Sequence, residues 1–131
     1  MDNLFDKHYT REEARSLLPE IQEWLERLQL LRNQIEEQEQ QLSELMKPGC
    51  DLGGDLVNHW TRGMAEIKVL LTKFFEREIQ IKDLERGLID FPSLREGKEV
   101  FLCWEQGEPD IDFWHDLEGG YAGRQPLEEE E

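Results

Sequence analysis

The hydrophobic residues of this chain change their period once, and that change constrains the fold more than any other feature. Before residue 78 the apolar positions recur at steps of three and four, which is typical of helices packed along a seam. After it, Ile79 and Ile81 alternate with Gln80 and Lys82, and such alternation is typical of a strand. The sequence therefore predicts an α+β protein in which helices come first and a small sheet follows.

The first helical segment begins with a clear start signal. Thr10 and Glu13 form a capping box, in which each side chain hydrogen-bonds the backbone amide of the other residue. Pro19 lacks the amide that an interior helical position needs, so we predict a short helix over 11–18 and a kink or restart at Pro19. The apolar seam that follows consists of Ile21, Trp24, Leu28, Leu31, Ile35, Leu42 and Leu45.

A second amphipathic segment follows a short break. The sequence KPGCDLGGD, which carries Cys50 at its tip, predicts a reversal because proline and glycine interrupt helices. The next seam consists of Val57, Trp60, Met64, Ile67, Leu71 and Phe74. Two seams joined by a short loop predict an antiparallel helical hairpin over about 10–77 that packs within one chain. Pairing of the seams between two chains is the alternative.

The alternating segments predict a three-stranded antiparallel β-meander. We expect its strands at about 78–83, 88–91 and 99–104, with a turn at Gly87 and a strand end before Pro92. In the alternative interpretation the second helix continues through Lys82 and ends at Gly87. The meander needs a surface to lie on, and the helical hairpin is the available one.

The C-terminal part changes character again. Residues 105–127 form a glycine-rich segment that we expect to fold over the hairpin and the meander, and Asp110 starts a predicted short helix over 111–117. The acidic residues 128–131 are expected to be disordered. The whole prediction is a single domain over 1–127.

Charge narrows the classes of partner. The net charge of −16 at pH 7 argues against binding to nucleic acid and to anionic membranes, both of which select basic surfaces. No apolar run is long enough to span a bilayer, and the first residues lack the pattern of a signal peptide. We therefore expect a cytoplasmic protein whose two cysteines, Cys50 and Cys103, are thiols.

One segment, GEPDIDFWHD, concentrates residues that can bind a metal. Asp112 and His115 are three positions apart, a common spacing for two ligands on a helix. Glu108 lies two turns before His115 on the same face of such a helix, with Asp112 between them. Asp90, near a strand end, is expected to complete a site for zinc, manganese or iron, with Asp83 as a further candidate. A water bound to such an ion would be acidified, which is the basis of metal-assisted hydrolysis.

The same residues also have a purely structural interpretation. His115 would then hydrogen-bond Glu108, and Arg124 would pair with Asp90 or Glu108 to hold the glycine-rich tail. Trp114 would pack on Trp104. Cys103 is expected to be a small buried apolar residue, and the alternative is a catalytic thiol with His115 as its base.

Several of these stretches resemble one family. The segments REEARSLLPEI, KDLERGLIDFP, VFLCWEQGE and FWHDLEGGYAGRQPL resemble a small bacterial family known only as a conserved domain of unknown function. The resemblance implies a soluble bacterial protein and no established activity. In that family a glycine often stands at the position of Glu78, which implies a helix end there; this chain departs from the pattern at that position, which leaves a later helix end open. The residues that carry the pattern include Lys82, Asp83, Asp90, Cys103, Trp104, Glu108, Trp114, His115 and Arg124.

These observations lead to two functional hypotheses of different class. The first is a non-enzymatic interaction or scaffold protein, dimerising through its helix surfaces because the first helix is longer than its partner. The second is a divalent-metal-binding protein, with hydrolase activity as its catalytic version, whose ligands come from Asp90, Glu108, Asp112 and His115.

Overall fold

The computed structural model describes residues 3–46 and 54–128. The predicted reversal with Cys50 and most of the acidic end of the chain lie outside the described residues. The elements follow each other as two long helices and then five short strands, with one 3₁₀ turn before the last strand. The predicted α+β class is confirmed.

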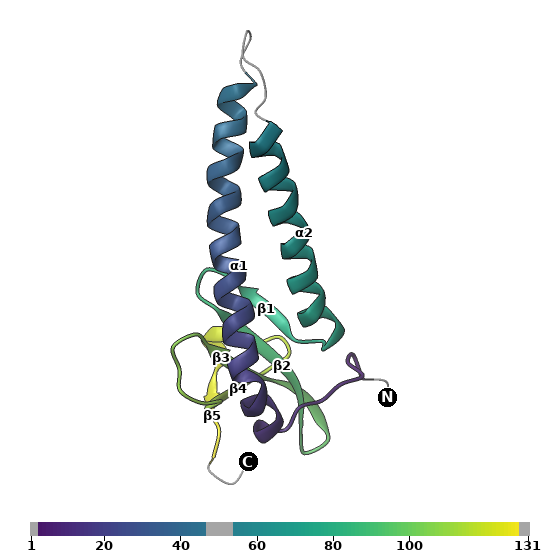
Figure 1. The fold of residues 1–131 in the computed structure, drawn as a ribbon. Coiled ribbons are helices and arrows are strands. Elements are labelled where there is room, and N and C mark those ends of the chain that lie inside the picture. The colour runs from purple at the N-terminus through teal and green to yellow at the C-terminus, as the bar shows by residue number, and fades with distance from the viewer. Residues whose placement is uncertain (1–2, 47–53, 129–131) are drawn as a thin grey trace.

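The two helices form the predicted hairpin. Helix α1 spans Arg11–Leu45 and helix α2 spans Gly54–Glu76, and together they rise from the sheet as an arm (Figure 1). The capping box at Thr10 is present, with the Glu13 amide donating to the Thr10 hydroxyl. Over the described residues, neither helix combines the length and the apolar character that a bilayer crossing requires.

The predicted interruption of the first helix at Pro19 is wrong. Helix α1 continues through Pro19, whose side chain is exposed to solvent. Its neighbours Leu18 and Ile21 are buried in the core. A proline inside a helix costs about 3 kcal/mol, and burial of the surrounding apolar face offsets that cost here.

Helix α2 ends through a backbone motif that does not need glycine in this chain. The amide of Ile79 donates to the carbonyl of Phe74 (3.1 Å), and the amide of Glu78 donates to the carbonyl of Phe75 (3.0 Å). This pair of bonds is the Schellman motif. Glu78 takes the left-handed position, with φ of 57°. The helix therefore ends where the family resemblance implied, and the alternative of a helix reaching Gly87 is wrong.

Within residues 3–46 and 54–128, the sheet has five strands rather than the predicted three. They are β1 (Gln80–Asp83), β2 (Leu88–Arg95), β3 (Lys98–Glu105), β4 (Phe113–Asp116) and β5 (Gln125–Pro126). All neighbours are antiparallel, in the order β1-β2-β3-β4-β5, so the sheet is an extended meander. The 3₁₀ turn η1 (Tyr121–Gly123) precedes β5.

The predicted helix over 111–117 is wrong, because this segment contains β4. In β4, His115 pairs with Phe101 and Trp114 pairs with Leu102. The segment is short, and its aromatic residues are compatible with a strand as well as a helix. Pairing with β3, which is distant in sequence, decides between the two.

Strand β2 extends beyond its predicted end at Pro92. Strand β1 pairs with β2 only as far as Asp90, so Pro92 lies at an open edge where no ladder needs its missing amide. The carbonyl of Pro92 instead accepts the amide of Tyr9 (2.7 Å), and the Ser93 hydroxyl donates to the Tyr9 carbonyl (2.6 Å). The chain just before α1 therefore continues the sheet edge.

Alternate residues of each strand point to opposite faces of the sheet. The inner face lies under the lower half of α1 (Figure 1) and contributes to the main core. That core includes Leu18, Ile21 and Leu25 from α1 and Ile89, Phe91, Leu102 and Trp104 from the sheet. The sheet thus covers the part of α1 that extends beyond α2. The extra length of α1 is accounted for within one chain and gives no support to dimerisation.

The outer face of the sheet is covered by segments from both ends of the chain. Before α1, Phe5 packs against Phe101 with ring centroids 5.5 Å apart, and the amides of Leu4 and Phe5 donate to the Glu99 carboxylate (2.7 and 3.0 Å). At the other end, the guanidinium of Arg124 lies 3.8 Å from the ring centroid of Phe113. In the part of the chain that the structure describes, these contacts cover the face without an α-helix.

Candidate functional site

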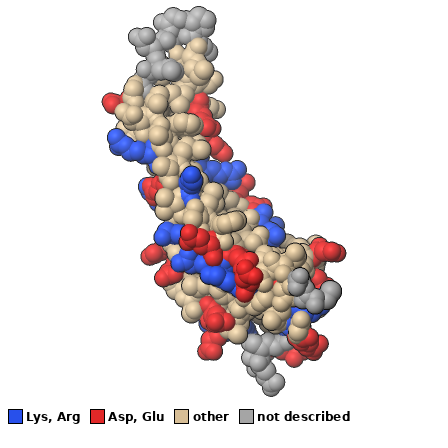
Figure 2. Space-filling view, turned by 90° about the vertical axis from the view of Figure 1, so that its right-hand side faces the viewer, with Lys and Arg blue, Asp and Glu red and all other residues tan. Residues whose placement is uncertain are grey.

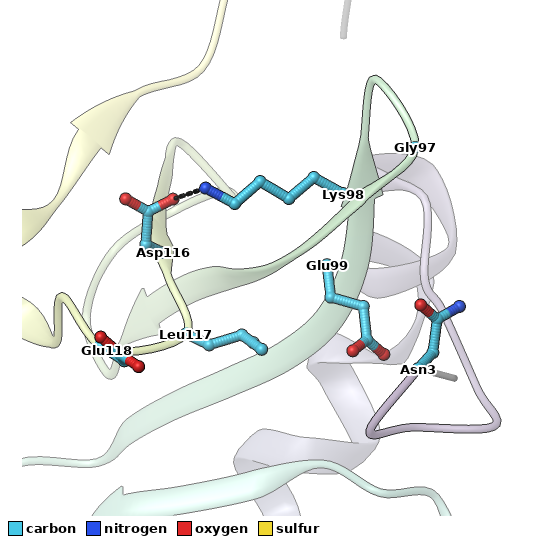
Figure 3. Close-up of a pocket in the computed structure, with 7 residues that line it drawn as sticks. All are labelled: Asn3, Gly97, Lys98, Glu99, Asp116, Leu117 and Glu118. Atoms are coloured by element: carbon cyan, nitrogen blue, oxygen red, sulfur yellow. Dashed lines mark hydrogen bonds and ion pairs between the residues drawn. The ribbon is translucent and has the colours of Figure 1, made fainter. Parts of the chain in front are cut away.

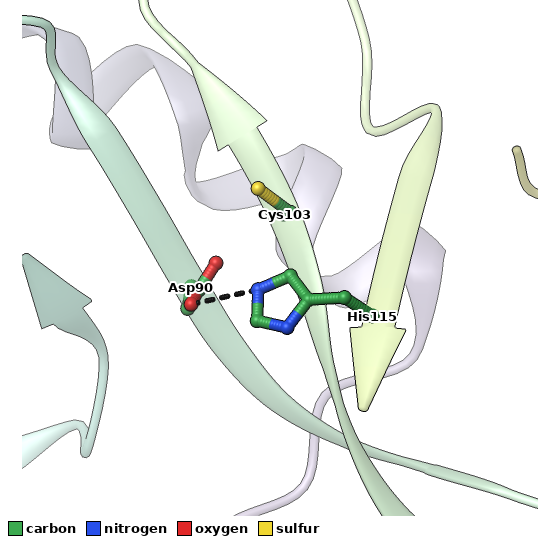
Figure 4. Close-up of side chains that lie close together, drawn as sticks. All are labelled: Asp90, Cys103 and His115. Carbon is green, nitrogen blue, oxygen red and sulfur yellow. Dashed lines mark hydrogen bonds and ion pairs between the residues drawn. The ribbon is translucent and has the colours of Figure 1, made fainter. Parts of the chain in front are cut away.

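The outer face brings together three buried polar side chains from three adjacent strands. Asp90 of β2 stands opposite Cys103 of β3, and His115 of β4 stands opposite Phe101, two residues from Cys103. Each of the three is only 1% exposed. Their potential ligand atoms all lie within 4.8 Å of one another (Figure 4). We refer to Asp90, Cys103 and His115 as the outer-face cluster.

Both ring nitrogens of His115 are engaged. Nδ1 lies 2.6 Å from the backbone carbonyl of Asp116, and Nε2 lies 2.9 Å from Oδ2 of Asp90. A carbonyl oxygen can only accept, so Nδ1 carries a proton. The contact with the carboxylate then needs a second proton, shared between Nε2 and Oδ2. Burial acts to lower the pKa of His115, but the bonds to Asp90 and Asp116 outweigh it and raise the pKa.

The thiol of Cys103 is held in its protonated form. Burial is the main cause and the nearby charge of Asp90 adds to it, and together they raise the pKa of Cys103 to about 12. A protonated thiol is a poor nucleophile, and His115 has no nitrogen left to deprotonate it. The geometry therefore disfavours the catalytic-thiol interpretation of this pair.

One oxygen of the cluster has no partner. Oδ1 of Asp90 is buried and makes no hydrogen bond with any of the described residues. A buried oxygen left without a donor typically costs about 1–3 kcal/mol, so such groups are rare and call for an explanation. An imidazole nitrogen, a sulfur and a carboxylate therefore converge in this cluster, and one oxygen of that carboxylate lacks a hydrogen-bond donor.

Glu108, one of the predicted ligands, is committed to another role. Nη2 of Arg124 donates to both carboxylate oxygens of Glu108 (2.7 Å each), and the amide of Glu105 donates to the same carboxylate. The backbone carbonyl of Glu108 accepts the indole N–H of Trp104 (2.9 Å). Glu108 therefore fixes the turn after β3 and the tail, as one structural alternative expected, and His115 bonds Asp90 rather than Glu108.

The other predicted site residues also have structural partners. Asp112 accepts from Arg11 of α1 (3.0 Å), and Asp83 accepts the Arg86 amide in the turn after β1. Lys82 lies over the ring of Phe101, 4.9 Å from its centroid. Trp104 is fully buried, and Trp114 packs against the same inner-face core. Of the four predicted ligands, the structure brings together only Asp90 and His115.

Cys103 is the cluster member that sequence reasoning did not assign as a ligand. No ligand spacing links it to Asp90 or His115, which are 13 and 12 residues away. Its partners follow from strand register, with Cys103 opposite Asp90 across one ladder and two residues from the partner of His115 across the next. The only available signal was that Cys103 alternates with Leu102 and Trp104 in a strand pattern, which placed it on the other face.

A separate surface cavity of about 540 Å³ lies beside the end of β4. Its lining is mainly charged, with Lys98 and Glu99 from β3 and Asp116 and Glu118 around the end of β4 (Figure 3). Lys98 reaches across to Asp116, with Nζ 3.4 Å from Oδ1. The lining includes no member of the outer-face cluster, so this cavity gives no direct access to it.

The surface of α2 offers a second candidate for function. Ile67, Leu70 and Phe74 belong to or pack on the core, and Gly63 allows close approach to Ile35 of α1. The predicted seam of α2 is therefore right only in part: Trp60 also meets α1, donating to the Glu39 carboxylate (3.1 Å), but Met64 and Leu71 do not belong to the buried face. Met64, Leu71 and Phe75 are 42%, 44% and 82% exposed.

These three exposed residues form one stripe. Spacings of seven and four place Met64, Leu71 and Phe75 on the same side of the helix. Figure 2 shows the side of the molecule that carries α2, where uncharged surface continues along the arm between separate charged groups. We refer to Met64, Leu71 and Phe75 as the α2 stripe.

One of the three comparisons with known proteins, the comparison with family models, agrees with the resemblance noted in the sequence. No curated protein and no solved structure matches the chain. The model of one family, described as an uncharacterized conserved protein (DUF2203), matches residues 7–127, from the segment before α1 to the residue after β5. The chain therefore belongs to the DUF2203 family.

Proposed function

We propose that this protein is a non-enzymatic interaction protein that pairs with a second copy of itself through the α2 stripe. The observation that carries the proposal is the exposure of Phe75, at 82%, together with Leu71 and Met64 on one line of the helix. Large apolar side chains that are aligned and exposed mark interaction surfaces, whereas scattered ones do not. Met64 and Leu71 are the members of the predicted seam that stay exposed, and a further helix that covers them would also cover Phe75.

Charge favours a second copy as the occupant. The chain carries a net charge of −16, so two copies repel each other over most of their surface. Helix α2 is the exception, since its three acidic residues are balanced by three basic ones, Arg62, Lys68 and Lys73. Helix α1 instead has nine acidic and four basic residues. Contact through α2 therefore minimises the repulsion between two acidic molecules.

An antiparallel arrangement of two α2 helices satisfies the stripe. A two-fold axis can cross the stripe at the height of residues 69–70 along the helix. It would place Phe75 of one copy against the partner's Met64, and the reverse, since these two residues lie at equal distances from that height. Contacts between a thioether and an aromatic ring are favourable. Leu71 of both copies then lies near the centre of the interface.

The outer-face cluster supports the non-enzymatic part of the proposal. Cys103 and His115 are the conventional catalytic groups in this cluster, and both are buried and engaged or protonated. The cavity of about 540 Å³ does not reach them. These features favour binding over catalysis as the role of the protein.

The test is the mass of the protein in solution as a function of concentration, measured by light scattering and analytical ultracentrifugation. We expect a species of twice the 15.6 kDa chain mass at high concentration. Phe75→Glu places a charge in an apolar interface, opposite the partner's Met64, and should weaken the dimer at least about tenfold, which corresponds to about 1.4 kcal/mol.

Val69→Glu is the matched control. Val69 is also on α2 and 58% exposed, but it lies about a third of a turn from the stripe, so its dimer affinity should equal that of the wild type. A protein that is monomeric at all concentrations contradicts the proposal. Equal weakening by both substitutions also contradicts it, because the effect would then come from charge alone.

A further inference from the structure

We propose that the outer-face cluster is a binding site for a divalent metal ion with the ligand preferences of zinc, held by Nε2 of His115, Sγ of Cys103 and the carboxylate of Asp90. The three ligand atoms lie within 4.8 Å of one another and the three residues are each 1% exposed. This inference is independent of dimerisation, since the cluster lies in the sheet and the α2 stripe lies on the arm (Figures 1 and 4).

The set of donor atoms selects the class of ion. One imidazole, one thiolate and one carboxylate suit zinc and other borderline divalent metals, whereas magnesium and calcium prefer oxygen ligands throughout. Zinc bonds of about 2.0–2.3 Å place tetrahedral ligand atoms about 3.3–3.8 Å apart. The separations in the cluster, from 2.9 Å between His115 and Asp90 up to 4.8 Å at most, need side-chain shifts of about 1 Å.

Two further observations, one hydrogen bond and one buried oxygen without a donor, point to a ligand. Nδ1 of His115 donates to the carbonyl of Asp116, which fixes the ring and leaves Nε2 directed into the cluster. Histidines that bind metals are usually oriented by such a bond from the other nitrogen. Oδ1 of Asp90 is buried without a partner among the described residues, and a metal ion would satisfy it.

The charges balance if the ion replaces two protons. The proton shared by Nε2 of His115 and Oδ2 of Asp90 leaves, and so does the thiol proton of Cys103. A neutral imidazole, a carboxylate and a thiolate around a divalent ion have zero total charge, as the protonated cluster has. The exchange therefore leaves no uncompensated charge in the buried cluster, so burial does not oppose it.

The neighbouring cations favour a neutral complex over a positive one. Lys82 and Arg124 both act electrostatically on the cluster, Lys82 on His115 and Arg124 on Cys103. They would oppose an ion bound by neutral ligands alone. Arg124 also favours the ionised form of the thiol, which the metal requires.

The experiment measures metal content and cobalt absorption on the full chain, purified without chelator. We expect about one zinc per chain by elemental mass spectrometry. Replacement of zinc by Co²⁺ should give a charge-transfer band from thiolate to cobalt, which reports ligation by Cys103 directly. Both signals should fall at least about tenfold in Cys103→Ala and His115→Gln, and circular dichroism should confirm that these variants still fold.

The chain offers matched controls for both side chains. Cys50→Ala removes the other cysteine, and His59→Gln removes a histidine on the exposed side of α2. Both should keep the zinc and the cobalt band. Zinc should also raise the midpoint of thermal unfolding of the wild type and leave that of Cys103→Ala unchanged.

Two results would overturn the proposal. One is a wild-type protein that shows no thiolate band with Co²⁺, a measurement that does not depend on any variant folding. The other is metal content that survives in Cys103→Ala or is lost in Cys50→Ala, since the ion would then be bound elsewhere.

Discussion

The two faces of the sheet both bury side chains almost fully, but the inner face buries apolar residues and the outer face also buries polar ones. On the inner face, Ile89 and Phe91 of β2 meet Leu102 and Trp104 of β3 beneath α1. One residue along the same strands, Asp90 stands opposite Cys103 on the outer face. Both sets are almost fully buried, yet only the outer set is polar. Burial alone therefore does not explain which residues this sheet places inside.

The difference lies in how each face is covered. A long helix lays a continuous apolar stripe on the inner face, and such surfaces are stabilised by the removal of apolar area from water. The outer face is covered by short segments near the two ends of the chain, held mainly by carboxylates and arginine. The inner face is built for stability, and the outer face is built around specific polar contacts.

The largest expected effect breaks the inner face. Phe91→Ala removes a ring that is 0% exposed and packs against Tyr9 with ring centroids 5.7 Å apart. We expect a loss of about 3–5 kcal/mol in the free energy of unfolding, because a cavity remains among fixed neighbours. Urea denaturation followed by circular dichroism measures it.

Phe75→Ala is the control for that substitution, because it removes the same ring from an exposed position. It should change the free energy of unfolding of the monomer by less than about 0.5 kcal/mol. A loss below 1 kcal/mol in Phe91→Ala would contradict the assignment of the inner face as the main core.

The second effect tests the outer face in chelator-treated protein. His115→Phe leaves Asp90 buried without its partner, and we expect a loss of about 3 kcal/mol in the free energy of unfolding. Adding Asp90→Leu to His115→Phe should recover most of that loss, since an apolar pair replaces the broken polar one. Chemical denaturation of the two single variants and the double variant measures the coupling.

This cycle separates stability from function. If the double variant is as stable as the wild type, the polar pair is not needed for the fold and its presence agrees with a ligand site. If the double variant is as unstable as His115→Phe, the outer face depends on these two polar residues for its packing, and the contrast between the faces is smaller than we infer.

A smaller effect concerns how the N-terminal segment is held. Glu78 adopts a left-handed φ of 57°, and its carboxylate accepts the amides of Asp6 and Lys7 (2.9 and 2.8 Å). Glu78→Gly relieves backbone strain of about 1 kcal/mol but loses two hydrogen bonds of similar total value. We expect the free energy of unfolding to change by less than about 1 kcal/mol, while the amides of Asp6 and Lys7 exchange faster with solvent in hydrogen-exchange NMR.

Glu96→Gly is the matched control for Glu78→Gly. Glu96 also has a positive φ, of 53°, and its exposed side chain makes no hydrogen bond or ion pair within the described parts of the chain. Its replacement should stabilise the protein by up to about 1 kcal/mol without changing exchange at Asp6. Unchanged exchange in Glu78→Gly would show that the carboxylate does not hold the segment.

The smallest expected effect is local and depends on pH. Burial acts to raise the pKa of Glu99, but bonds from His8 and from the amides of Leu4 and Phe5 outweigh it, so the pKa is lowered from 4.5. A lowered pKa means that Glu99 contributes stability above pH 4.5, and that this contribution is lost as the pH falls further. NMR shifts of the Leu4 and Phe5 amides should therefore move toward unfolded values in acid.

Glu99→Gln provides the reference for this titration. In that variant the same two amides should already be displaced at pH 7 and should not titrate with Glu99. Shifts that move equally with pH in both proteins would assign the effect to other carboxylates.

The parts of the fold that sequence could predict depend on local signals. The capping box of Thr10 and Glu13 and the alternation of residues 99–104 are contained in a few neighbouring residues, and both are confirmed. Pro19 and strand β4 could not be predicted in the same way. Packing of Leu18 and Ile21 overrides the local cost at Pro19, and pairing with β3 decides the structure of β4. Both depend on contacts that are distant in sequence.

The candidate site shows the same division. Residue types alone pointed to Asp90 and His115, and the structure places them in contact, but their role as metal ligands stays a prediction. By residue type alone, Glu108 was an equally reasonable ligand. In the structure, however, its carboxylate accepts hydrogen bonds from Arg124 and is not part of the cluster. Cys103 joins the cluster through strand register, which a single sequence does not encode in readable form.

The closure of the outer face by both ends of the chain has a consequence for how the protein folds during synthesis. The contact of Leu4 with Glu99 joins residues 95 apart, and that of Arg11 with Ile111 joins residues 100 apart. Helical contacts can form while the ribosome is still working, but these pairings must wait until most of the chain has emerged. We therefore expect the hairpin to form early and the segment before α1 to dock last, so that residues synthesised before either helix become ordered after both.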